Sequence, residues 1–470
     1  MPRCVDLELN SDLAENGVQG FSFFQQRQIS ENENRRMVKH ADLEAPIVSN
    51  ARTLAKVLQR LVLARERLGE KIVERVPDVI TRAGRLLLDP NHPLHKRALL
   101  AGERNRMTPQ MTREALRNLF RGVTIQRLRA FRQRELAVAR GYTLYPPTLV
   151  FHNLAGNLFL SGLESIILGM LAGGANLVRC SNSDRSFPRI WQEAVNSIDE
   201  AVGKTIFVGW WEHSALEITR TAMEHAHAVL AYGEDETIRT LRNLAPSECR
   251  FIGHGNRVSF ALLDETDLQP KRLARLCSNL AYDFLIYDQR GCMSPLGVFV
   301  VSRTVGPVEQ FCEMLCQSFR KIARRFPGWP FTLEEQATVA AIREEARIGA
   351  ALALAKHHKQ LCTTKIISRE DDPFLLLLQP AQDFTVGCGL RTAHVWWASS
   401  YETVFRVLQK LRGQVSTIGV AHTNAQWAEL ALSVRAGRLC KIGQMQKPSL
   451  GWAHDGFLPL LPLMTVVRIE

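Results

Sequence analysis

The feature that most constrains the fold is a regular alternation of short apolar runs and amphipathic segments between residues 148 and 244. The apolar runs are rich in aliphatic residues, which indicates buried strands, and each is followed by a segment with apolar residues at helical spacing. Because parallel strands need crossover helices, this order predicts an α/β fold with a parallel, doubly wound sheet. Ligands of such sheets bind at the carboxyl ends of the strands. The four predicted strands are TLVFHNLAG, ANLVRCS, KTIFVGW and HAVLAYG.

Three regions differ in their sequence patterns. Residues 1–250 contain a polar, irregular stretch up to about residue 45, a helical arginine-rich segment and the strand–helix alternation. Residues 251–440 contain two long helical segments and further alternating strands and helices, and residues 441–470 contain three prolines and a final strand-like run. We therefore predict two α/β domains, a helical N-terminal region and a C-terminal segment that closes the fold.

The charge of the chain is strongly positive, with 59 Lys and Arg residues against 47 Asp and Glu residues. Many arginines lie between Leu58 and Arg140, where they alternate with Leu, Phe and Ile at helical spacing. This pattern is typical of a solvated helix face, and no DNA-reading motif accompanies it, so we expect no nucleic-acid partner. A nucleic-acid-binding protein on a degenerate enzyme fold stays open as an alternative. The positive field also favours anionic ligands such as a nucleotide cofactor or a coenzyme A thioester.

Apolar stretches and cysteines indicate the cellular setting. The N-terminal residues are polar and acidic and show no signal-peptide pattern. The longest apolar stretches are interrupted by Glu164 or by prolines, so none reaches the ~18 apolar residues of a membrane span. The ten cysteines show no C-x-x-C pair and no paired spacing. We therefore expect reduced thiols, a cytoplasmic location, no membrane span and no metal site.

One cysteine has surroundings that suit chemistry. The stretch DQRGCMSPLGVFV places Cys292 after Gly291 and just before a β-type run. A thiolate is nucleophilic, and the neighbouring glycine would let a substrate carbonyl approach closely. The adjacent Arg290 would stabilise a thiolate if its side chain faces the sulfur, but it can equally point away. On this segment alone, a buried structural cysteine is the simpler interpretation.

Two common catalytic or cofactor motifs are absent from the sequence. No G-x-G-x-x-G is present, so a dinucleotide site cannot be inferred from that fingerprint. No G-x-S-x-G is present either, which excludes the usual nucleophile elbow of serine hydrolases.

Taken in order, however, several segments resemble the aldehyde dehydrogenase superfamily, and more specifically its fatty-acyl-CoA reductase (LuxC) family. The resemblance runs from about Tyr142 to Ile469, and it depends on the order and spacing of the segments rather than on one motif. The segments that carry it are NLAGN, LESIILGMLAGGANLVRCSNSD, AVLAYGEDETI, FIGHGNRVSFALL, DQRGCMSP and KIGQMQKP with GWAHDG.

The resemblance implies a fold and catalytic residues. An aldehyde dehydrogenase-like fold would place a Rossmann-type nicotinamide-cofactor domain within residues 1–250 and an α/β catalytic domain within residues 251–440. Cys292 falls where the family has its nucleophile. Asn157 falls on the asparagine that forms the oxyanion hole together with the backbone N–H of the cysteine. A helix N-cap is the structural alternative for Asn157, and the two roles are compatible.

The resemblance also implies a nicotinamide cofactor. Superfamily members that prefer NAD often carry a glutamate that repels a 2′-phosphate, and its absence here, with an arginine nearby, favours NADPH, with NADH as the alternative. The acidic residues in the turn at Gly233 do not help a phosphate, so a looser site is expected than in a Rossmann fingerprint. The implied cofactor-binding residues are Arg179, Ser181, Gly233, Glu234, His254 and Gly255.

One departure from the superfamily narrows the reaction. Hydrolytic aldehyde dehydrogenases have a glutamate that activates water, and Gly253 falls at that place in this sequence. Hydrolysis of an acyl-enzyme is then disfavoured, which suits reduction of an acyl thioester through an S-acyl-cysteine. The neighbouring His254 would act as an acid or base, or would contact the nicotinamide through its backbone alone.

The predicted function is therefore NADPH-dependent reduction of an acyl-CoA or acyl-carrier-protein thioester to an aldehyde. An aldehyde-oxidising dehydrogenase and a cysteine acyltransferase without hydride transfer are the alternatives. By analogy with the superfamily, we expect a homo-oligomer, and a partner subunit stays open.

Overall fold

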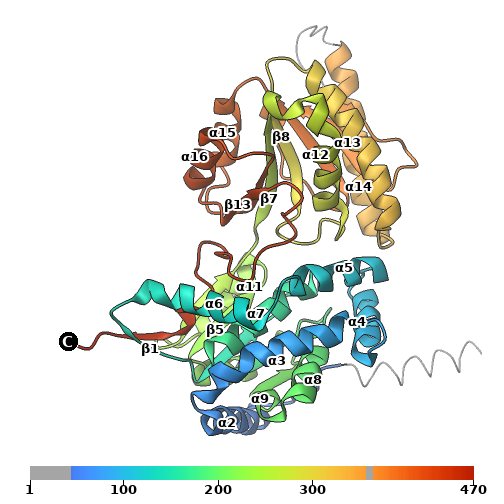
Figure 1. Ribbon diagram of the computed structural model, residues 1–470. Coiled ribbons are helices and arrows are strands. Elements are labelled where there is room, and N and C mark those ends of the chain that lie inside the picture. Colours follow the sequence, from blue (N-terminus) through green and yellow to red (C-terminus); the bar gives the residue numbers. More distant parts are fainter. Residues whose placement is uncertain (1–43, 356–363) are drawn as a thin grey trace, which may run out of the picture. The chain divides into compact units, whose positions relative to one another are not determined.

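The computed structural model describes residues 44–355 and 364–470 (Figure 1). The N-terminal half of these residues contains a five-stranded parallel sheet. The irregular stretch predicted up to about residue 45 lies almost entirely outside these residues. The strand order is β4-β3-β2-β5-β6. The sheet extends to His254, beyond residue 250, where we placed the start of the second domain. Its strands are β2 (Leu149–Asn153), β3 (Ala175–Arg179), β4 (Ile206–Gly209), β5 (Ala228–Tyr232) and β6 (Arg250–His254).

A seven-stranded sheet follows, in the order β13-β12-β7-β8-β11-β10-β9. Its neighbours are parallel except for the short edge strand β9, which is antiparallel to β10. Two sheets of parallel strands with helices between them confirm the predicted α/β fold class. The strands are β7 (Val258–Asp264), β8 (Pro295–Val301), β9 (Lys365–Ile366), β10 (Leu375–Pro380), β11 (Thr392–Ala398), β12 (Val415–Val420) and β13 (Arg438–Lys441).

Helices cover both faces of the five-stranded sheet. One face packs against α2, α10 and α11, and the other packs against α7 and α8, which α3 to α6 cover in turn. These helices are α2 (Ala51–Leu68), α3 (Lys71–Leu88), α4 (Pro93–Arg104), α5 (Pro109–Phe120), α6 (Ile125–Leu136), α7 (Phe159–Ala172), α8 (Phe187–Ile198), α9 (Glu200–Gly203), α10 (Leu216–His225) and α11 (Asp235–Leu244).

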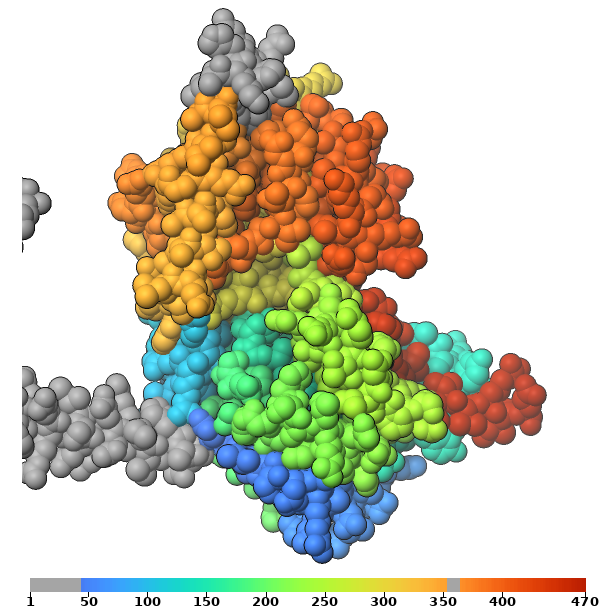
Figure 2. Space-filling model, turned by 180° about the vertical axis from the view of Figure 1, so that it is seen from behind, coloured from blue at the N-terminus to red at the C-terminus, as the bar shows by residue number. Residues whose placement is uncertain are grey.

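The seven-stranded sheet is also covered on both faces, with α12 and α13 on one side and α15 and α16 on the other (Figure 1). Helix α14 lies outermost and leaves Ile348 and Leu352 exposed; Figure 2 shows it in orange from the opposite side. These helices are α12 (Pro270–Leu285), α13 (Gly306–Arg325), α14 (Leu333–Ala355), α15 (Tyr401–Gln409) and α16 (Ala425–Ser433).

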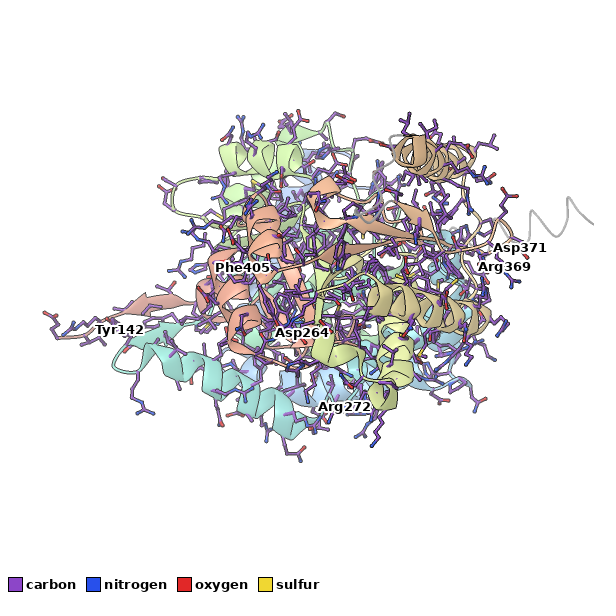
Figure 3. All side chains as sticks on the ribbon, turned by 90° about the horizontal axis from the view of Figure 1, so that it is seen from above. Tyr142, Asp264, Arg272, Arg369, Asp371 and Phe405 are labelled. Atoms are coloured by element: carbon purple, nitrogen blue, oxygen red, sulfur yellow. The ribbon has the colours of Figure 1, made fainter. Side chains whose placement is uncertain are left out.

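The C-terminal segment returns to the first half of the chain. Strand β14 (Thr465–Val467) pairs antiparallel with β1 (Thr143–Tyr145), which directly precedes the first sheet. Figure 3 shows Tyr142 beside this two-stranded ribbon, where it is exposed. No helix within the described ranges is both long and apolar enough to cross a membrane.

Candidate active site

A polar cavity of about 800 Å³ lies at the carboxyl ends of the strands of the five-stranded sheet. The loops that follow β2, β3, β5 and β6 form most of its wall, as expected for a parallel sheet. The loop before β8 closes it from the side of the seven-stranded sheet. All eight residues predicted from the sequence line this cavity, namely Asn157, Arg179, Ser181, Gly233, Glu234, His254, Gly255 and Cys292.

The loop that carries Cys292 is held by buried polar contacts. Asp288 and Gln289 both have positive φ angles, of 52° and 56°, which non-glycine residues rarely adopt. The Asp288 carboxylate accepts hydrogen bonds from the buried Arg391 guanidinium and from the backbone N–H of Trp329. The Gln289 amide donates to the carbonyls of Pro295 and Thr392, at 2.9 and 3.0 Å. These contacts fix an otherwise unfavourable backbone just ahead of the cysteine.

The Cys292 thiol is half-buried and lies in a turn. Its carbonyl accepts a hydrogen bond of 2.6 Å from the hydroxyl of Ser259 on β7, which ties the turn to the sheet. Burial, together with the negative charge of Asp455, raises the pKa of the thiol to about 11. The neighbouring Arg290 forms an ion pair with Glu335 at 3.6 Å. Near neutral pH the thiol is therefore protonated and must lose a proton before it can attack.

Asn157 lies beside the cysteine loop, on the turn between β2 and α7. Its Nδ2 donates to the carbonyl of Arg290 at 3.3 Å, and its Oδ1 accepts from the N–H of Leu158 at 3.0 Å. Helix α7 begins at Phe159, and its cap residue is Leu158, which makes no side-chain cap. The N-cap alternative for Asn157 is therefore wrong. Its amide is exposed to the cavity that Cys292 also lines.

Arg179 supplies a positive charge at the end of β3. Its two terminal nitrogens donate to Asn153 Oδ1 and to the carbonyl of Trp211, at 2.9 and 3.0 Å. Among the residues that the structure describes, its buried Nε has no hydrogen-bond partner, and burial lowers the pKa of the group. A buried guanidinium with an unused donor, at the wall of a polar cavity, suits an anionic ligand.

Ser181 stands just beyond Arg179 and shapes a narrow part of the cavity. Its hydroxyl accepts the N–H of Asp184 at 3.0 Å. A Cβ added at Gly156, across from it, would lie 1.7 Å from Ser183 Oγ and 2.6 Å from Ser181 Oγ. The absence of a side chain at Gly156 therefore keeps this part of the wall open.

The turn after β5 places backbone atoms near the turn after β6. The Gly233 N–H donates to the carbonyl of His254 at 3.2 Å, and Glu234 precedes α11 without capping it through its side chain. A Cβ at Gly255 would lie only 2.2 Å from the carboxylate of Asp235. A larger residue here would displace the Asp235 carboxylate, which accepts the N–H of Asn256, so glycine keeps this turn open to the cavity.

These features fit a nicotinamide dinucleotide. The cavity offers a guanidinium, serine hydroxyls and backbone amides beside the start of a helix, which are the donors that phosphates and ribose hydroxyls require. The acidic Glu234 and Asp235 stand in the same turn, which limits the helix dipole there.

A second, apolar pocket of about 80 Å³ reaches Cys292 from another direction. Helices α5 and α7 and the C-terminal segment contribute most of its wall. Cys292, Asn157 and His454 line both spaces. The apolar lining residues are Leu119, Leu158, Leu160, Met293, Pro448, Leu450 and Trp452.

One carboxyl lies in this apolar wall. Glu164 on α7 accepts a hydrogen bond of 3.1 Å from the indole N–H of Trp452. Burial raises the pKa of the carboxyl to about 7. Glu164 was noted in the sequence only as an interruption of an apolar stretch, because its partner lies 288 residues away.

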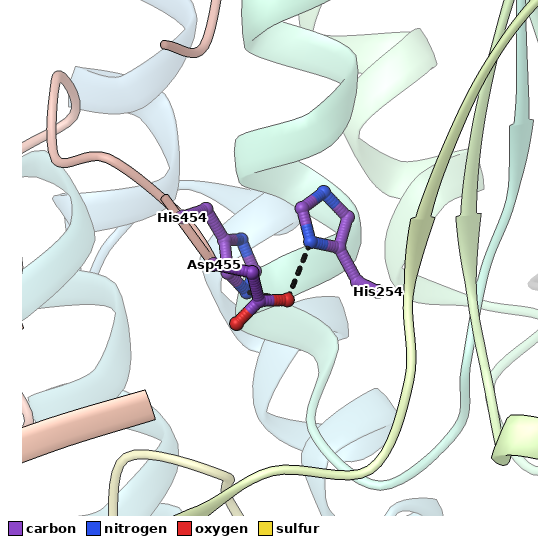
Figure 4. Close-up of side chains that lie close together, drawn as sticks. All are labelled: His254, His454 and Asp455. Carbon is purple, nitrogen blue, oxygen red and sulfur yellow. Dashed lines mark hydrogen bonds and ion pairs between the residues drawn. The ribbon is translucent and has the colours of Figure 1, made fainter. Parts of the chain in front are cut away.

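His254 forms a hydrogen-bonded pair with Asp455, a residue that the sequence did not mark (Figure 4). The distance from its Nδ1 to Asp455 Oδ2 is 2.8 Å. The imidazole stacks against both Tyr232 and His454, with ring centroids 4.7 and 4.0 Å away, and those two rings lie 5.8 Å from each other. The stretch GWAHDG contributed to the family resemblance, but nothing in it indicated that His454 and Asp455 meet β6.

Another group of ionisable side chains, Asp264, Asp267 and His422, lies at the opposite end of β7 from the cysteine loop (Figure 3 labels Asp264). The Asp264 carboxylate accepts hydrogen bonds from Tyr401, Asn424 and Thr266. Its contacts tie β7 to α15 and to the loop before α16. This cluster is separate from the candidate active site.

The sequence model of the acyl-CoA reductase (LuxC) family matches residues 70–466. The chain belongs to this family. Among curated relatives, the long-chain acyl-protein thioester reductase 2 of Photobacterium leiognathi is 25% identical over 325 residues, which cover 68% of this chain and 63% of the relative. The long-chain acyl-protein thioester reductase of Aliivibrio fischeri is 24% identical over 331 residues, covering 69% and 64%. The chain thus spans slightly less than two thirds of each relative's length.

Solved structures confirm the aldehyde dehydrogenase-like fold. Aldehyde dehydrogenase 21 from Physcomitrella patens superposes with a TM-score of 0.61 at 10% identity, covering 89% of this chain and 91% of that one. PnpE from Pseudomonas sp. WBC-3 gives a TM-score of 0.64 at 13% identity, covering 90% of each chain. At sequence identities this low, the similarity supports a shared fold and nothing further.

Proposed function

We propose that this protein reduces a long-chain acyl thioester to the aldehyde, with NADPH as the reductant and a covalent S-acyl intermediate on Cys292. The observation that carries the proposal is that Cys292 and Asn157 stand where a polar cavity and an apolar pocket meet. The polar cavity suits a dinucleotide, and the apolar pocket suits an alkyl chain. The names of the curated relatives support the same substrate class.

The covalent step begins with attack of the Cys292 sulfur on the thioester carbonyl. A tetrahedral oxyanion forms, for which the Asn157 amide and the backbone N–H of Cys292 are the proposed donors. Preorganised donors of this kind lower the barrier because they need no reorganisation as the charge develops. The C–S bond to the donor thiol then breaks, and the acyl group stays on Cys292.

A nicotinamide bound in the polar cavity would supply the hydride that reduces the acyl carbon. Arg179, Ser181 and the backbone at Gly233 and Gly255 would hold the dinucleotide. The Arg179 charge would favour a 2′-phosphate, which is the basis for proposing NADPH over NADH. The Cys292 sulfur is the leaving group when the aldehyde forms, and it then takes up one proton.

The apolar pocket would hold the part of the acyl chain nearest the thioester. Seven of its 16 lining residues are Leu, Met, Pro or Trp. Each methylene transferred from water to such a wall contributes about 0.8 kcal/mol. A long chain would therefore bind far better than an acetyl group.

Aldehyde oxidation with hydrolysis is the less favoured candidate. Gly253 lies on β6, where hydrolytic members would have their general base, and a Cβ there would meet Ile238 at 2.6 Å. A glutamate at this position would have no room without displacing its neighbours. The acyl-enzyme would then persist until it is reduced.

The function is tested by following NADPH oxidation with a panel of acyl thioesters of different chain length. Wild type should oxidise NADPH with long-chain thioesters, and Cys292→Ser should lose activity by at least about 10³-fold, since a hydroxyl is a far weaker nucleophile. Cys316→Ser, a buried thiol of α13 outside both pockets, is the matched control. Equal rates for wild type and Cys292→Ser would exclude the covalent route.

A further inference from the structure

We infer that His254 is the general base and acid of the acyl-transfer step, with Asp455 as the residue that positions it. This inference rests on the proposed function, because it concerns the proton that the Cys292 thiol must lose. The geometry points to it through three observations, namely the state of the thiol, the His254–Asp455 pair and the shared cavity.

The first observation is that the surroundings of Cys292 do not favour a thiolate. Burial raises the pKa of the half-buried thiol to about 11, and the negative fields of Asp455 and Glu164 add to this shift. At neutral pH only about one molecule in 10⁴ would carry a free thiolate. A thiol in such surroundings needs a base that takes the proton as the sulfur attacks.

The second observation is the orientation of the His254 imidazole. Its Nδ1 lies 2.8 Å from Asp455 Oδ2, and Asp455 is also 3.5 Å from Arg257 Nε (Figure 4). Burial opposes ionisation of this carboxyl, but the bond to His254 and the nearby cations lower its pKa overall. An ionised carboxylate accepts from Nδ1–H, which leaves Nε2 as a bare acceptor. In the described part of the chain, Nε2 has no hydrogen-bond partner.

The third observation is that the ring cannot easily turn away. It packs against the rings of Tyr232 and His454, which also contact each other, and it is only 6% exposed. Asp455 itself is held in the left-handed region, at φ 52°, by the turn that ends the GWAHDG stretch. His254 and Cys292 line the same polar cavity, and the thiol lies within the electrostatic reach of Asp455, the partner of His254.

The neighbouring His454 is a poorer base. Burial and the nearby His254 lower its pKa to about 3, so it has little affinity for a proton. The two imidazoles are stacked 4.0 Å apart at an interplanar angle of 23°. In-plane lone pairs of nearly parallel rings do not converge on one point, which argues against a metal ion held by both rings. The ionisable groups that surround His254 are Tyr232 on β5, Arg257 after β6, Cys292, His454 and Asp455.

The proton that leaves Cys292 ends on the departing thiol. His254 Nε2 takes the proton of Cys292 as the new C–S bond forms and the carbonyl π electrons move to oxygen. When the oxyanion collapses, the C–S bond to the donor breaks and its sulfur leaves as a thiolate. The imidazolium gives this thiolate the proton, so a neutral thiol departs and His254 is ready again. No oxidant or reductant takes part.

The test uses a single turnover without nicotinamide, in which the full-length protein is mixed with a long-chain acyl-CoA and the released thiol is measured from pH 6 to pH 10. Wild type should react at neutral pH with a shallow pH dependence. His254→Asn should be about 10²–10⁴-fold slower at pH 7. Its rate should then rise about tenfold per pH unit, because only hydroxide can remove the thiol proton.

Further variants separate a chemical role from a structural one. Asp455→Asn keeps the shape of the pair but not its charge, and it should slow thiol release at pH 7 by at least about tenfold. His225→Asn alters an exposed histidine at the end of α10 and should behave as wild type. Thermal unfolding midpoints report whether each variant is folded, and His254→Gln replaces His254→Asn if the latter is not.

Each outcome of the pH series has a different meaning. If the rate of thiol release by His254→Asn approaches that of wild type towards pH 10, the inference is supported. Parallel pH profiles, with the same ratio at every pH, would overturn it while leaving the proposed function intact. Absence of thiol release from wild type itself would overturn both.

Discussion

The two spaces that meet at Cys292 differ in both chemistry and origin. The polar cavity is built from loops at the carboxyl ends of β2, β3, β5 and β6, and its groups are a guanidinium, hydroxyls and glycine backbone. The apolar pocket is built mainly from two helices and the C-terminal segment, and its wall combines aliphatic side chains and one indole with a few polar groups such as Glu164. The difference supports the proposal that a nucleotide binds on one side of the sulfur and an alkyl chain on the other.

The junction of the two spaces contains residues that belong to both. Cys292 and Asn157 line both spaces, and the buried contacts of Asp288 and Gln289 hold the cysteine loop between them. The chemistry should therefore be most sensitive at this junction, less sensitive in the polar cavity, and least sensitive in the apolar wall. Three variants test this order.

The largest of the three effects is expected from Asn157→Ala at the junction. Loss of one oxyanion donor typically lowers the rate about 10²–10³-fold, and it should affect acyl transfer and reduction alike. The measurement is single-turnover thiol release followed by NADPH oxidation. Asn196→Ala, on an exposed position of α8, is the control. A loss below threefold in both steps would remove Asn157 from the oxyanion hole.

A smaller effect is expected in the polar cavity from Arg179→Met. Loss of a charge-assisted contact should weaken NADPH binding about 10- to 100-fold and NADH binding much less. Thiol release without cofactor should be unchanged. Fluorescence titration with both nucleotides, alongside the exposed Arg239→Met, gives the answer. Equal losses for NADPH and NADH would show that Arg179 does not recognise the 2′-phosphate.

The smallest effect is expected from Glu164 in the apolar wall, and it should depend on pH. The carboxyl has a pKa raised from 4.5 to about 7, so it is neutral below pH 7 and charged above it. An alkyl chain would have to desolvate the charged form, so KM for the acyl donor should rise above pH 7, by up to about tenfold per unit. Glu164→Gln should remove this rise. A KM that climbs equally in both proteins would assign the effect to another group.

The same raised pKa has a consequence for stability. The folded protein binds this proton more tightly than the unfolded chain, so the stabilisation is complete below pH 4.5 and is lost as the pH rises through about 7. Glu164→Gln should therefore gain stability relative to wild type between pH 5 and pH 8, as measured by thermal unfolding. A constant difference across that range would contradict the assignment.

The polar half of the site could be predicted from the sequence because its residues follow strands. Arg179 ends a predicted strand and Gly233 follows another, and the carboxyl ends of parallel strands meet at one edge of a sheet. The eight residues that line the cavity were named from the family resemblance. The strand pattern by itself accounts for the common edge of residues such as Arg179 and Gly233.

Contacts between distant parts of the chain could not be predicted in the same way. Glu164 meets Trp452 across 288 residues, and His254 meets Asp455 across 201 residues, and no local periodicity encodes such contacts. The role of Arg391 is hidden for the same reason, because its partner Asp288 lies 103 residues earlier in the chain. Asn157 shows the converse error. The local sequence allowed Asn157 to be the N-cap of a helix, but in the structure the cap residue is Leu158.

The most direct test of the central claim is mass spectrometry of the protein after mixing with a long-chain acyl thioester in the absence of nicotinamide. The account predicts one acyl group per chain, located on the peptide that contains Cys292, and its complete loss after NADPH is added, with the matching aldehyde in solution. An adduct on another cysteine, such as Cys277 or Cys312, or an adduct on Cys292 that NADPH leaves in place, would contradict it.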